Sequence, residues 1–337
     1  MMRLKSAHTV FSFVGKERDR LMNPRKAAII GCGHVGASIA FALMQRALFS
    51  EMVLIDVDRR RAEGEALDLS HGLPYTAAMD VYAGDYDDMG DAAIAIITAG
   101  VSQKPGESRL DLTRRNVVIL EEIIHNIRRT EFEGILLIVS NPVDVLTWEA
   151  QRISGYPAHR VIGSGTVLDT GRLKYLLGRN LNVDPRSIHA FVIGEHGDSE
   201  LTVWSSANVS GIDLENFCAL RSETECGCKQ TQVDRDVRES AQDIICRKGA
   251  TYYGIAMATA RICESIVKDE QAVLPVSTIL HGEYGLSGLS LSVPAVIGVS
   301  GVETVLEIPL SQQENEALVF SAKRLLEVIS SLDTVMV

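Results

Sequence analysis

The stretch AAIIGCGHVGASIA, residues 27–40, carries three glycines, Gly31, Gly33 and Gly36, in the spacing GxGxxG. An apolar run precedes them and an apolar helical pattern follows, which predicts a strand, a tight turn and a helix. In such a turn the first glycine permits the bend, the second lets backbone approach a pyrophosphate, and the third allows close packing of helix on strand. The stretch therefore predicts a dinucleotide-binding βαβ unit.

An acidic residue in the next predicted strand favours one form of the dinucleotide. The run VLIDVD, residues 53–58, places Asp56 20 residues after Gly36. A carboxylate there accepts hydrogen bonds from a ribose 2′-hydroxyl and repels a 2′-phosphate, which favours NAD over NADP. The alternative is an ordinary aspartate at the end of a strand.

The first half of the chain alternates short apolar runs with longer segments of helical periodicity. Runs such as AAIAIITAG and ILLIVSNP have little polar alternation, which suits strands covered on both faces of a parallel sheet. The second half mixes helices, a strand pair near 188–204, short strands at 273–299 and a final helix at 312–330. We therefore predict an α/β fold: a Rossmann doubly wound parallel sheet over 23–164 and a mixed α+β substrate-binding domain over 165–337.

Composition excludes several function classes. The chain has 337 residues, is 46% hydrophobic and 23% charged, and carries a net charge of −11. That charge disfavours nucleic acid and anionic lipid as partners, and no apolar run approaches a membrane span. Residues 1–22 are basic and lack a convincing signal peptide, so we expect a flexible extension and a cytoplasmic protein.

The six cysteines show no CxxC pairing. A chain of this size needs no disulfides, so we expect reduced thiols. Cys226 and Cys228 have no histidine nearby, which favours surface thiols over a metal site. We accordingly predict no metal cofactor.

A histidine in the stretch VIGEHGDSE, residues 192–200, is a candidate acid–base group. A lone histidine is more often structural than catalytic, so His196 needs partners. The stretch GTVLDTGRLK supplies Asp169 and Arg172, which share one side of a predicted helix. A carboxylate from Asp169 would fix the imidazole tautomer and stabilise the imidazolium, although the acid and the arginine could also form a structural salt bridge.

Two further segments follow predicted strand ends. The stretch AGVSQKPGESRLDLTRRN has the glycines and proline of a mobile loop and carries Gln103 and Arg109, which either reach a ligand or are solvated. The stretch SNPVD places Asn141 at the ligand edge of the same sheet.

Together these motifs, with KGATYYGIAMA and LSVPAVIGVSGVETVLEIPL, resemble the NAD-dependent L-lactate dehydrogenases of bacteria, within the lactate and malate dehydrogenase superfamily. The resemblance runs from about Arg25 to the C-terminus. It implies that the chain interconverts pyruvate and L-lactate with NADH and NAD, in glycolysis and fermentation. His196 is implied as the acid–base, braced by Asp169.

The resemblance also implies a role for the other candidate residues. Arg172 would bind the substrate carboxylate through a bidentate fork, and Arg109 would polarise the carbonyl as the loop closes. Asn141 would contact nicotinamide and substrate, and Thr251 would lie beside the substrate methyl. The implied cofactor contacts are Gly31, Gly33, Val35, Gly36, Asp56, Ala99, Gly100 and Asn141.

The choice of hydroxy acid rests on Gln103. Similar malate dehydrogenases have an arginine there, which pairs with the second carboxylate of oxaloacetate. A neutral glutamine lacks that charge-assisted pair of about 1.5–3 kcal/mol, so pyruvate is favoured by about ten- to a hundredfold. Malate dehydrogenase, another 2-hydroxyacid dehydrogenase and a non-catalytic NAD-binding protein are the alternatives. A non-catalytic NAD-binding protein would not need His196, Asp169, Arg172 and Arg109 together.

Some bacterial lactate dehydrogenases are homotetramers activated by fructose 1,6-bisphosphate, which an arginine and a histidine bind. The matching positions here are Lys174 and His189. A lysine can bind phosphate with less geometric definition than an arginine, so activation and two surface residues without a role are equal alternatives. We expect a homotetramer.

Overall fold

The computed structural model describes residues 22–102, 106, 108–221 and 230–333, apart from the side chains of Arg109 and Asp333. Of the predicted extension over residues 1–22, residues 1–21 lie outside them. Six parallel strands form one side of the main sheet, out to its edge at β3, in the order β6-β5-β4-β1-β2-β3. Their bounds are β1 Asn23–Ile30, β2 Glu51–Ile55, β3 Asp80–Ala83, β4 Ala92–Ile97, β5 Ile135–Ile138 and β6 Val161–Gly163.

This order is that of the doubly wound dinucleotide-binding fold, and it confirms the predicted fold class. Strand β4 shows why these sequences form parallel strands, since all six of its residues are buried. From β1 the strand order proceeds to β2 and β3 on one side and to β4, β5 and β6 on the other, so the topological switch point lies between β1 and β4. Doubly wound sheets bind their ligands at this point. The helices of this half are α1 His34–Arg46, α2 Arg59–Gly72, α3 Arg109–Ile127 and α4 Val143–Ser154.

Local sequence sets the ends of these helices. Asp58 caps α2, because its carboxylate accepts hydrogen bonds from the backbone N–H groups of Arg60 and Arg61. Helix α4 ends at Gly155, which adopts the left-handed conformation at φ +67°. Asp58 thus fixes where α2 begins, and Gly155 fixes where α4 ends.

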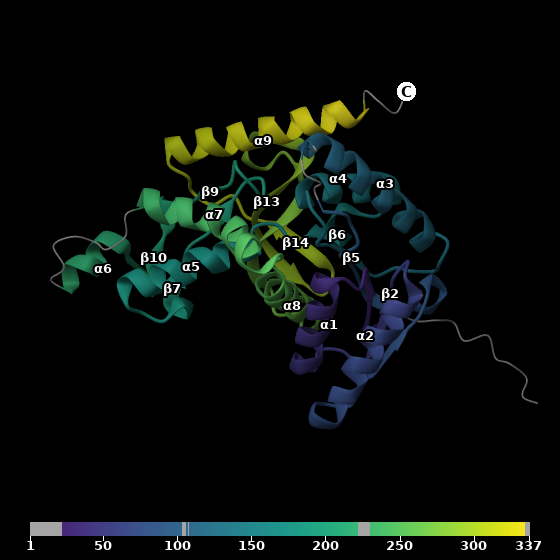
Figure 1. Ribbon diagram of the computed structural model, residues 1–337. Coiled ribbons are helices and arrows are strands. Elements are labelled where there is room, and N and C mark those ends of the chain that lie inside the picture. The colour runs from purple at the N-terminus through teal and green to yellow at the C-terminus, as the bar shows by residue number, and fades with distance from the viewer. Residues whose placement is uncertain (1–21, 103–105, 107, 222–229, 334–337) are drawn as a thin grey trace, which may run out of the picture.

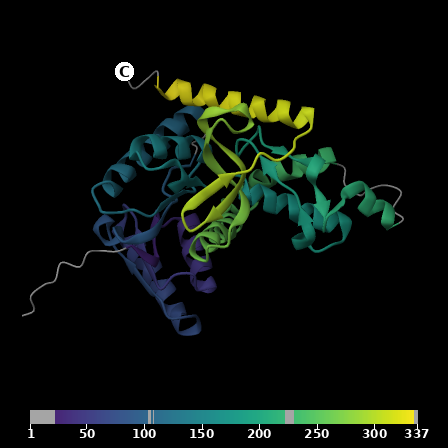
Figure 2. The same cartoon turned by 180° about the vertical axis from the view of Figure 1, so that it is seen from behind.

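The second half extends the same sheet and adds two small ones. Strand β12 pairs with β6 through Ser277 and Gly163, and β13 and β14 follow in antiparallel order, so one sheet has nine strands. The expected short strands at 273–299 are wrong in length. They form one long hairpin, visible in Figure 2, made of β12 Ala272–His281 and β13 Ser287–Gly298, with β14 Gly301–Val305 at its edge.

Helices and small sheets complete the second half. Gly249, at φ +84°, separates α7 from α8. The helices are α5 Val167–Leu181, α6 Leu214–Leu220, α7 Gln230–Lys248, α8 Tyr253–Val267 and α9 Gln312–Asp333. The short strands are β7 Ile188–His189, β8 Val192–Ile193, β9 Leu201–Thr202, β10 Asn208–Val209 and β11 Ile212–Asp213.

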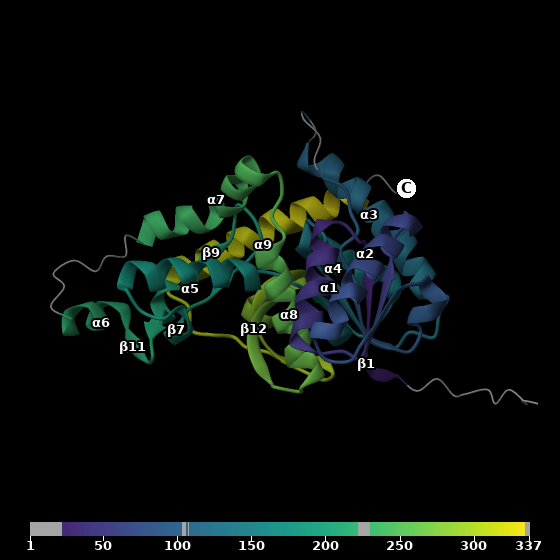
Figure 3. The ribbon, with the colours of Figure 1, turned by 60° about the horizontal axis from the view of Figure 1, so that its bottom comes forward.

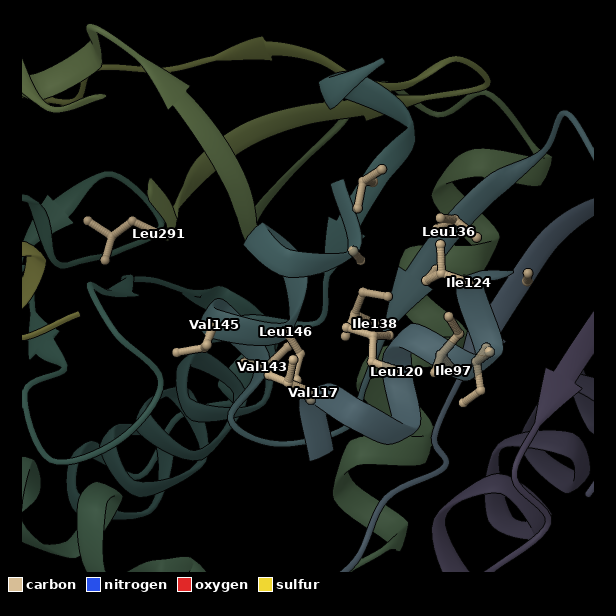
Figure 4. Packing of buried hydrophobic residues seen from close by; sticks show 14 of the residues in the cluster. Ile97, Val117, Leu120, Ile124, Leu136, Ile138, Val143, Val145, Leu146 and Leu291 are labelled. Atoms are coloured by element: carbon tan, nitrogen blue, oxygen red, sulfur yellow. The ribbon is translucent and has the colours of Figure 1, made fainter. Parts of the chain in front are cut away.

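Two apolar layers cover the two faces of the main sheet. On one face, Ile97 and Ile138 of the sheet pack against Leu120 and Ile124 of α3 and Leu146 of α4 (Figure 4). On the other face, α8 lies beside α1, as Figure 3 shows, and closes a second buried cluster. Helix α9 lies along the outside of α4 and β13 (Figure 1). The sheet is thus a rigid support for the loops at its carboxyl edge.

Two further results bear on the sequence predictions. Within the described residues, no helix is both long and apolar enough to span a membrane. The expectation of six reduced thiols is wrong for Cys218, which is disulfide-bonded. Cys32, Cys246 and Cys263 are free, and Cys226 and Cys228 lie outside the described residues.

Candidate active site

The glycine turn joins β1 to α1 and has the three properties that its spacing predicts. Gly31 has φ +101°, and a Cβ there would lie 2.5 Å from the backbone nitrogen of Ala99. A Cβ at Gly36 would lie 1.9 Å from the carbonyl oxygen of Gly31. At Gly33, by contrast, a Cβ would meet nothing within 4 Å. Only the second glycine therefore faces open space, where a ligand can approach the backbone.

The start of α1 suits a phosphate. Gly33 is its N-cap residue, and no side chain caps the helix. The first N–H groups of a helix have no partner within the helix, and together with its dipole they favour an anion. Val35 is partly buried, and its side chain packs against the core.

Asp56 is tied to the same turn. One carboxylate oxygen accepts a hydrogen bond from the Cys32 N–H at 2.6 Å, and the other accepts one from the Asp58 N–H at 2.9 Å. Asp56 lines a hollow of about 460 Å³, together with Gly31, Gly33, Ala99 and Gly100. The residues present therefore fit a dinucleotide, with an open glycine turn for its pyrophosphate and a carboxylate for its ribose.

His196 and Asp169 form the contact expected of an acid–base pair. Asp169 lies in the first turn of α5 and is 1% exposed, and its Oδ2 is 2.6 Å from Nδ1 of His196. The other oxygen, Oδ1, accepts a hydrogen bond from Arg172 at 2.6 Å. One buried carboxylate therefore bonds both the imidazole and the guanidinium, and Nε2 of His196 remains for another partner.

The charges around the pair favour its ionised form. Burial on its own lowers the pKa of the His196 imidazole, but the charge and hydrogen bond of Asp169, helped by Glu200 and Asp144, raise it to about 9. Burial also opposes ionisation of Asp169, but His196 and Arg172 outweigh it and lower the pKa of this carboxyl. The imidazole is therefore protonated at neutral pH, as a proton donor must be.

His196 stands between two hollows. The larger, of about 710 Å³, is also lined by Asp169 and Arg172 and by Arg235 and Arg238 of α7. The smaller, of about 250 Å³, lies on the other side and is lined by residues that include Thr113, Asn141, Pro142 and Glu195. A small molecule in either hollow would thus contact the acid–base group.

Glu200 is a site residue that the sequence analysis missed. It is 6% exposed and lines the larger hollow, and burial beside Asp169 raises the pKa of its carboxyl to about 8. Ligating atoms of Asp169, His196 and Glu200 lie within 4.8 Å of one another. A cation there would face the Arg172 guanidinium that bonds Asp169. The stretch GEHGDSE contains Glu200, but only the turn from Gly197 to Glu200 directs it back toward His196.

The remaining predicted residues are less closely grouped. Thr251 lies in the link between α7 and α8 and is not part of either hollow beside His196. Lys174 on α5 is half-buried, and burial lowers its pKa, whereas His189 on β7 is exposed. Gln103 and the side chain of Arg109 lie outside the described residues, although Arg109 begins α3.

A dinucleotide-binding turn together with a buried histidine–aspartate–arginine group defines an NAD-dependent dehydrogenase, and the sequence families agree. The lactate/malate dehydrogenase NAD-binding domain matches residues 25–163, and the alpha/beta C-terminal domain of the same family matches residues 166–334. The chain belongs to the lactate/malate dehydrogenase family.

Within that family the chain is similar to proteins named L-lactate dehydrogenase. It is 48% identical to the one from Moorella thermoacetica, over 93% of this chain and 99% of the relative, and 45% identical to the one from Acetivibrio thermocellus, over 92% and 98%. The fold is similar to the minor L-lactate dehydrogenase of Enterococcus mundtii in its ligands-bound form, with a TM-score of 0.87 and 42% identity over 92% of this chain and 98% of that one. A deep-sea metagenomic lactate dehydrogenase, MGS-M5, has a TM-score of 0.88 and 41% identity over 92% and 99%.

Proposed function

We propose that the chain is an NAD-dependent L-lactate dehydrogenase, which reduces pyruvate to L-lactate and oxidises L-lactate in reverse. The observation that carries the proposal is the 2.6 Å contact of His196 with Asp169, whose other oxygen bonds Arg172. Family membership and relatives named L-lactate dehydrogenase support it. The reaction would regenerate NAD in glycolysis and fermentation.

His196 is the proposed proton donor. Its Nδ1 is held by Asp169, so the proton on Nε2 is the one available to a substrate carbonyl oxygen. Bound NADH would supply the hydride that reduces the carbonyl carbon. In the reverse direction the neutral imidazole would accept the proton of the lactate hydroxyl.

Arg172 is the proposed anchor for the substrate carboxylate. One of its nitrogens bonds Asp169, and the planar guanidinium has further N–H groups for a bidentate contact. We also propose that Asn141 contacts nicotinamide and substrate, that Arg109 polarises the carbonyl, and that Thr251 and Gln103 shape the space for the substrate side chain. Cofactor contacts are proposed for Gly31, Gly33, Val35, Gly36, Asp56, Ala99 and Gly100.

NADH oxidation by purified protein with pyruvate, oxaloacetate and larger 2-oxo acids tests the proposal. We expect kcat/KM for pyruvate to exceed that for oxaloacetate, and a His196→Asn variant to bind NADH but lose turnover. Faster turnover of oxaloacetate would indicate a malate dehydrogenase. NADH binding without turnover of any 2-oxo acid would indicate a non-catalytic NAD-binding protein.

Regulation and assembly are separate proposals. We propose a homotetramer, to be tested by sedimentation, with fructose 1,6-bisphosphate bound by Lys174 and His189. Activity with subsaturating pyruvate should rise when the bisphosphate is added, and an unchanged KM would reject that site. We also propose a cytoplasmic location, which cell fractionation tests. The proposed domain organisation is a flexible extension over 1–22, an NAD-binding domain over 23–164 and a substrate-binding domain over 165–337.

A further inference from the structure

A second buried carboxylate, that of Asp144, contacts the backbone of His196. Asp144 is in the first turn of α4 and is 1% exposed. Its Oδ2 accepts a hydrogen bond from the backbone N–H of His196 at 2.8 Å. Its Oδ1 accepts hydrogen bonds from the hydroxyls of Ser277 at 2.6 Å and Ser292 at 3.0 Å. The carboxylate therefore joins α4, β12, β13 and the loop of His196.

The hydrogen bonds indicate that Asp144 is ionised. The His196 N–H can only donate, and the two serine hydroxyls are placed to donate to the carboxyl. Both serines are fully buried, so solvent does not compete for them. Burial raises the pKa of the Asp144 carboxyl, and the donors from Ser277 and His196 oppose that rise. A carboxylate with three donors is the form that suits this setting.

The loop that carries His196 has other attachments, so the contribution of Asp144 can be separated from them. Gly194 and Ser292 exchange two backbone hydrogen bonds, of 2.9 and 3.2 Å. The Glu195 N–H donates to the hydroxyl of Ser321 on α9 at 2.8 Å. These contacts hold the loop without Asp144, whereas the N–H of His196 itself is bonded by Asp144.

We propose that Asp144 is a positioning residue for the acid–base step, which fixes the backbone of His196 and adds a second negative charge that favours its protonated imidazole. The inference rests on the proposed function. The charged groups around the imidazole come from α5 (Asp169, Arg172), from α4 (Asp144), from its own loop (Glu195, Asp198, Glu200) and, across the larger hollow, from α7 (Arg235, Arg238, Glu239). Asp169 fixes the ring, and Asp144 fixes the backbone that bears it.

The test is the pH profile of kcat/KM for pyruvate reduction by Asp144→Asn. The substitution keeps the size of the side chain and removes its charge. Because pyruvate reduction needs the protonated imidazole, activity falls as the pH rises through its pKa. We expect that falling limb to move to lower pH by about 0.5–1 unit in the variant, with a larger change in kcat than in KM. Asp144→Ser provides a second neutral variant.

Thr147→Val is the matched control. Thr147 is fully buried one turn further along α4, and its hydroxyl bonds the carbonyl oxygen of Val143. The change loses a buried hydrogen bond, as Asp144→Asn does, but alters no charge. We expect it to lower the melting temperature and to leave the falling limb where it is.

The outcomes separate the two proposals. A parent protein that does not reduce pyruvate refutes the proposed function. An active parent whose falling limb does not move in Asp144→Asn or Asp144→Ser refutes the role of Asp144 and leaves a structural carboxylate. If neither variant folds, the double variant Ser277→Ala/Ser292→Ala provides the test. It removes two of the donors to Asp144, and a buried carboxyl without them takes up a proton and loses its charge. Its limb should move in the same direction, and an unmoved limb refutes the inference.

Discussion

Replacing Asp169 by asparagine would isolate the contribution of its charge to catalysis. The pKa of His196 is about 9, against an ordinary value of 6.5. That difference corresponds to about 3 kcal/mol in favour of the protonated imidazole. Burial on its own lowers this pKa, so without the Asp169 charge it should fall to about 6.5 or below.

The expected loss of activity has two parts that pH separates. At pH 7.5 an imidazole with a pKa of about 6.5 is roughly one-tenth protonated, so protonation accounts for about a tenfold loss. Loss of the tautomer and ring orientation should bring the total to about 10²–10⁴-fold, as in other enzymes that lose this carboxylate. At pH 5.5 the tenfold part should return, while the loss from orientation should persist.

The assay is kcat/KM for pyruvate reduction with saturating NADH, from pH 5 to 10, for the parent and Asp169→Asn. A variant whose activity still falls only near pH 9, or that loses less than about tenfold at pH 7.5, would refute the reasoning. The pair also affects stability. Because the folded chain has the higher pKa for His196, its stabilisation is complete below pH 6.5 and is lost as the pH rises through 9.

Three further predictions concern other parts of the site. Arg172→Lys should lower kcat/KM for pyruvate by about ten- to a hundredfold, mainly through KM, because the bidentate fork is lost; an unchanged KM in steady-state assays would contradict it. Gly33→Ala should keep the parental melting temperature but weaken NADH binding, measured by fluorescence, whereas Gly36→Ala should destabilise the fold; equal melting temperatures for the two variants would count against the assigned geometry. Glu200→Gln should raise the melting temperature at pH 8 but not at pH 4.5: the folded chain holds this proton up to about pH 8, against an ordinary pKa of 4.5, so parental stability falls across that interval. Equal melting curves of variant and parent at pH 8 would argue against it.

The features that sequence predicted well are those that follow from local rules. The spacing of Gly31, Gly33 and Gly36 specifies a turn whose backbone needs those glycines, and each has the expected surroundings. The pairing of Asp169 with Arg172 follows from helical spacing. The meeting of His196 with Asp169 follows from no local rule, since the two are 27 positions apart; it is predicted because an acid–base imidazole needs a carboxylate, and the family resemblance implies the same pair.

The features that it missed depend on contacts between distant segments. Strand β12 joins the main sheet by pairing Ser277 with Gly163, and no local pattern encodes that partner. Asp144 and Glu200 look like ordinary acidic residues in the sequence. Their surroundings differ because hydroxyls from β12 and β13 enclose the first, and because a turn places the second beside His196 and Asp169.

The unbroken nine-stranded sheet has a consequence for how ligands are accommodated. The glycine turn follows β1, and the loop of His196 is fastened to β13, so both are mounted on the same hydrogen-bonded support. A long ligand that contacts both would meet two surfaces whose separation was set when the chain folded. The entropic cost of aligning these two surfaces is therefore met when the chain folds and not when the ligand binds. Binding should then need only local adjustment of loops and α7, without a hinge rotation of one half of the chain against the other.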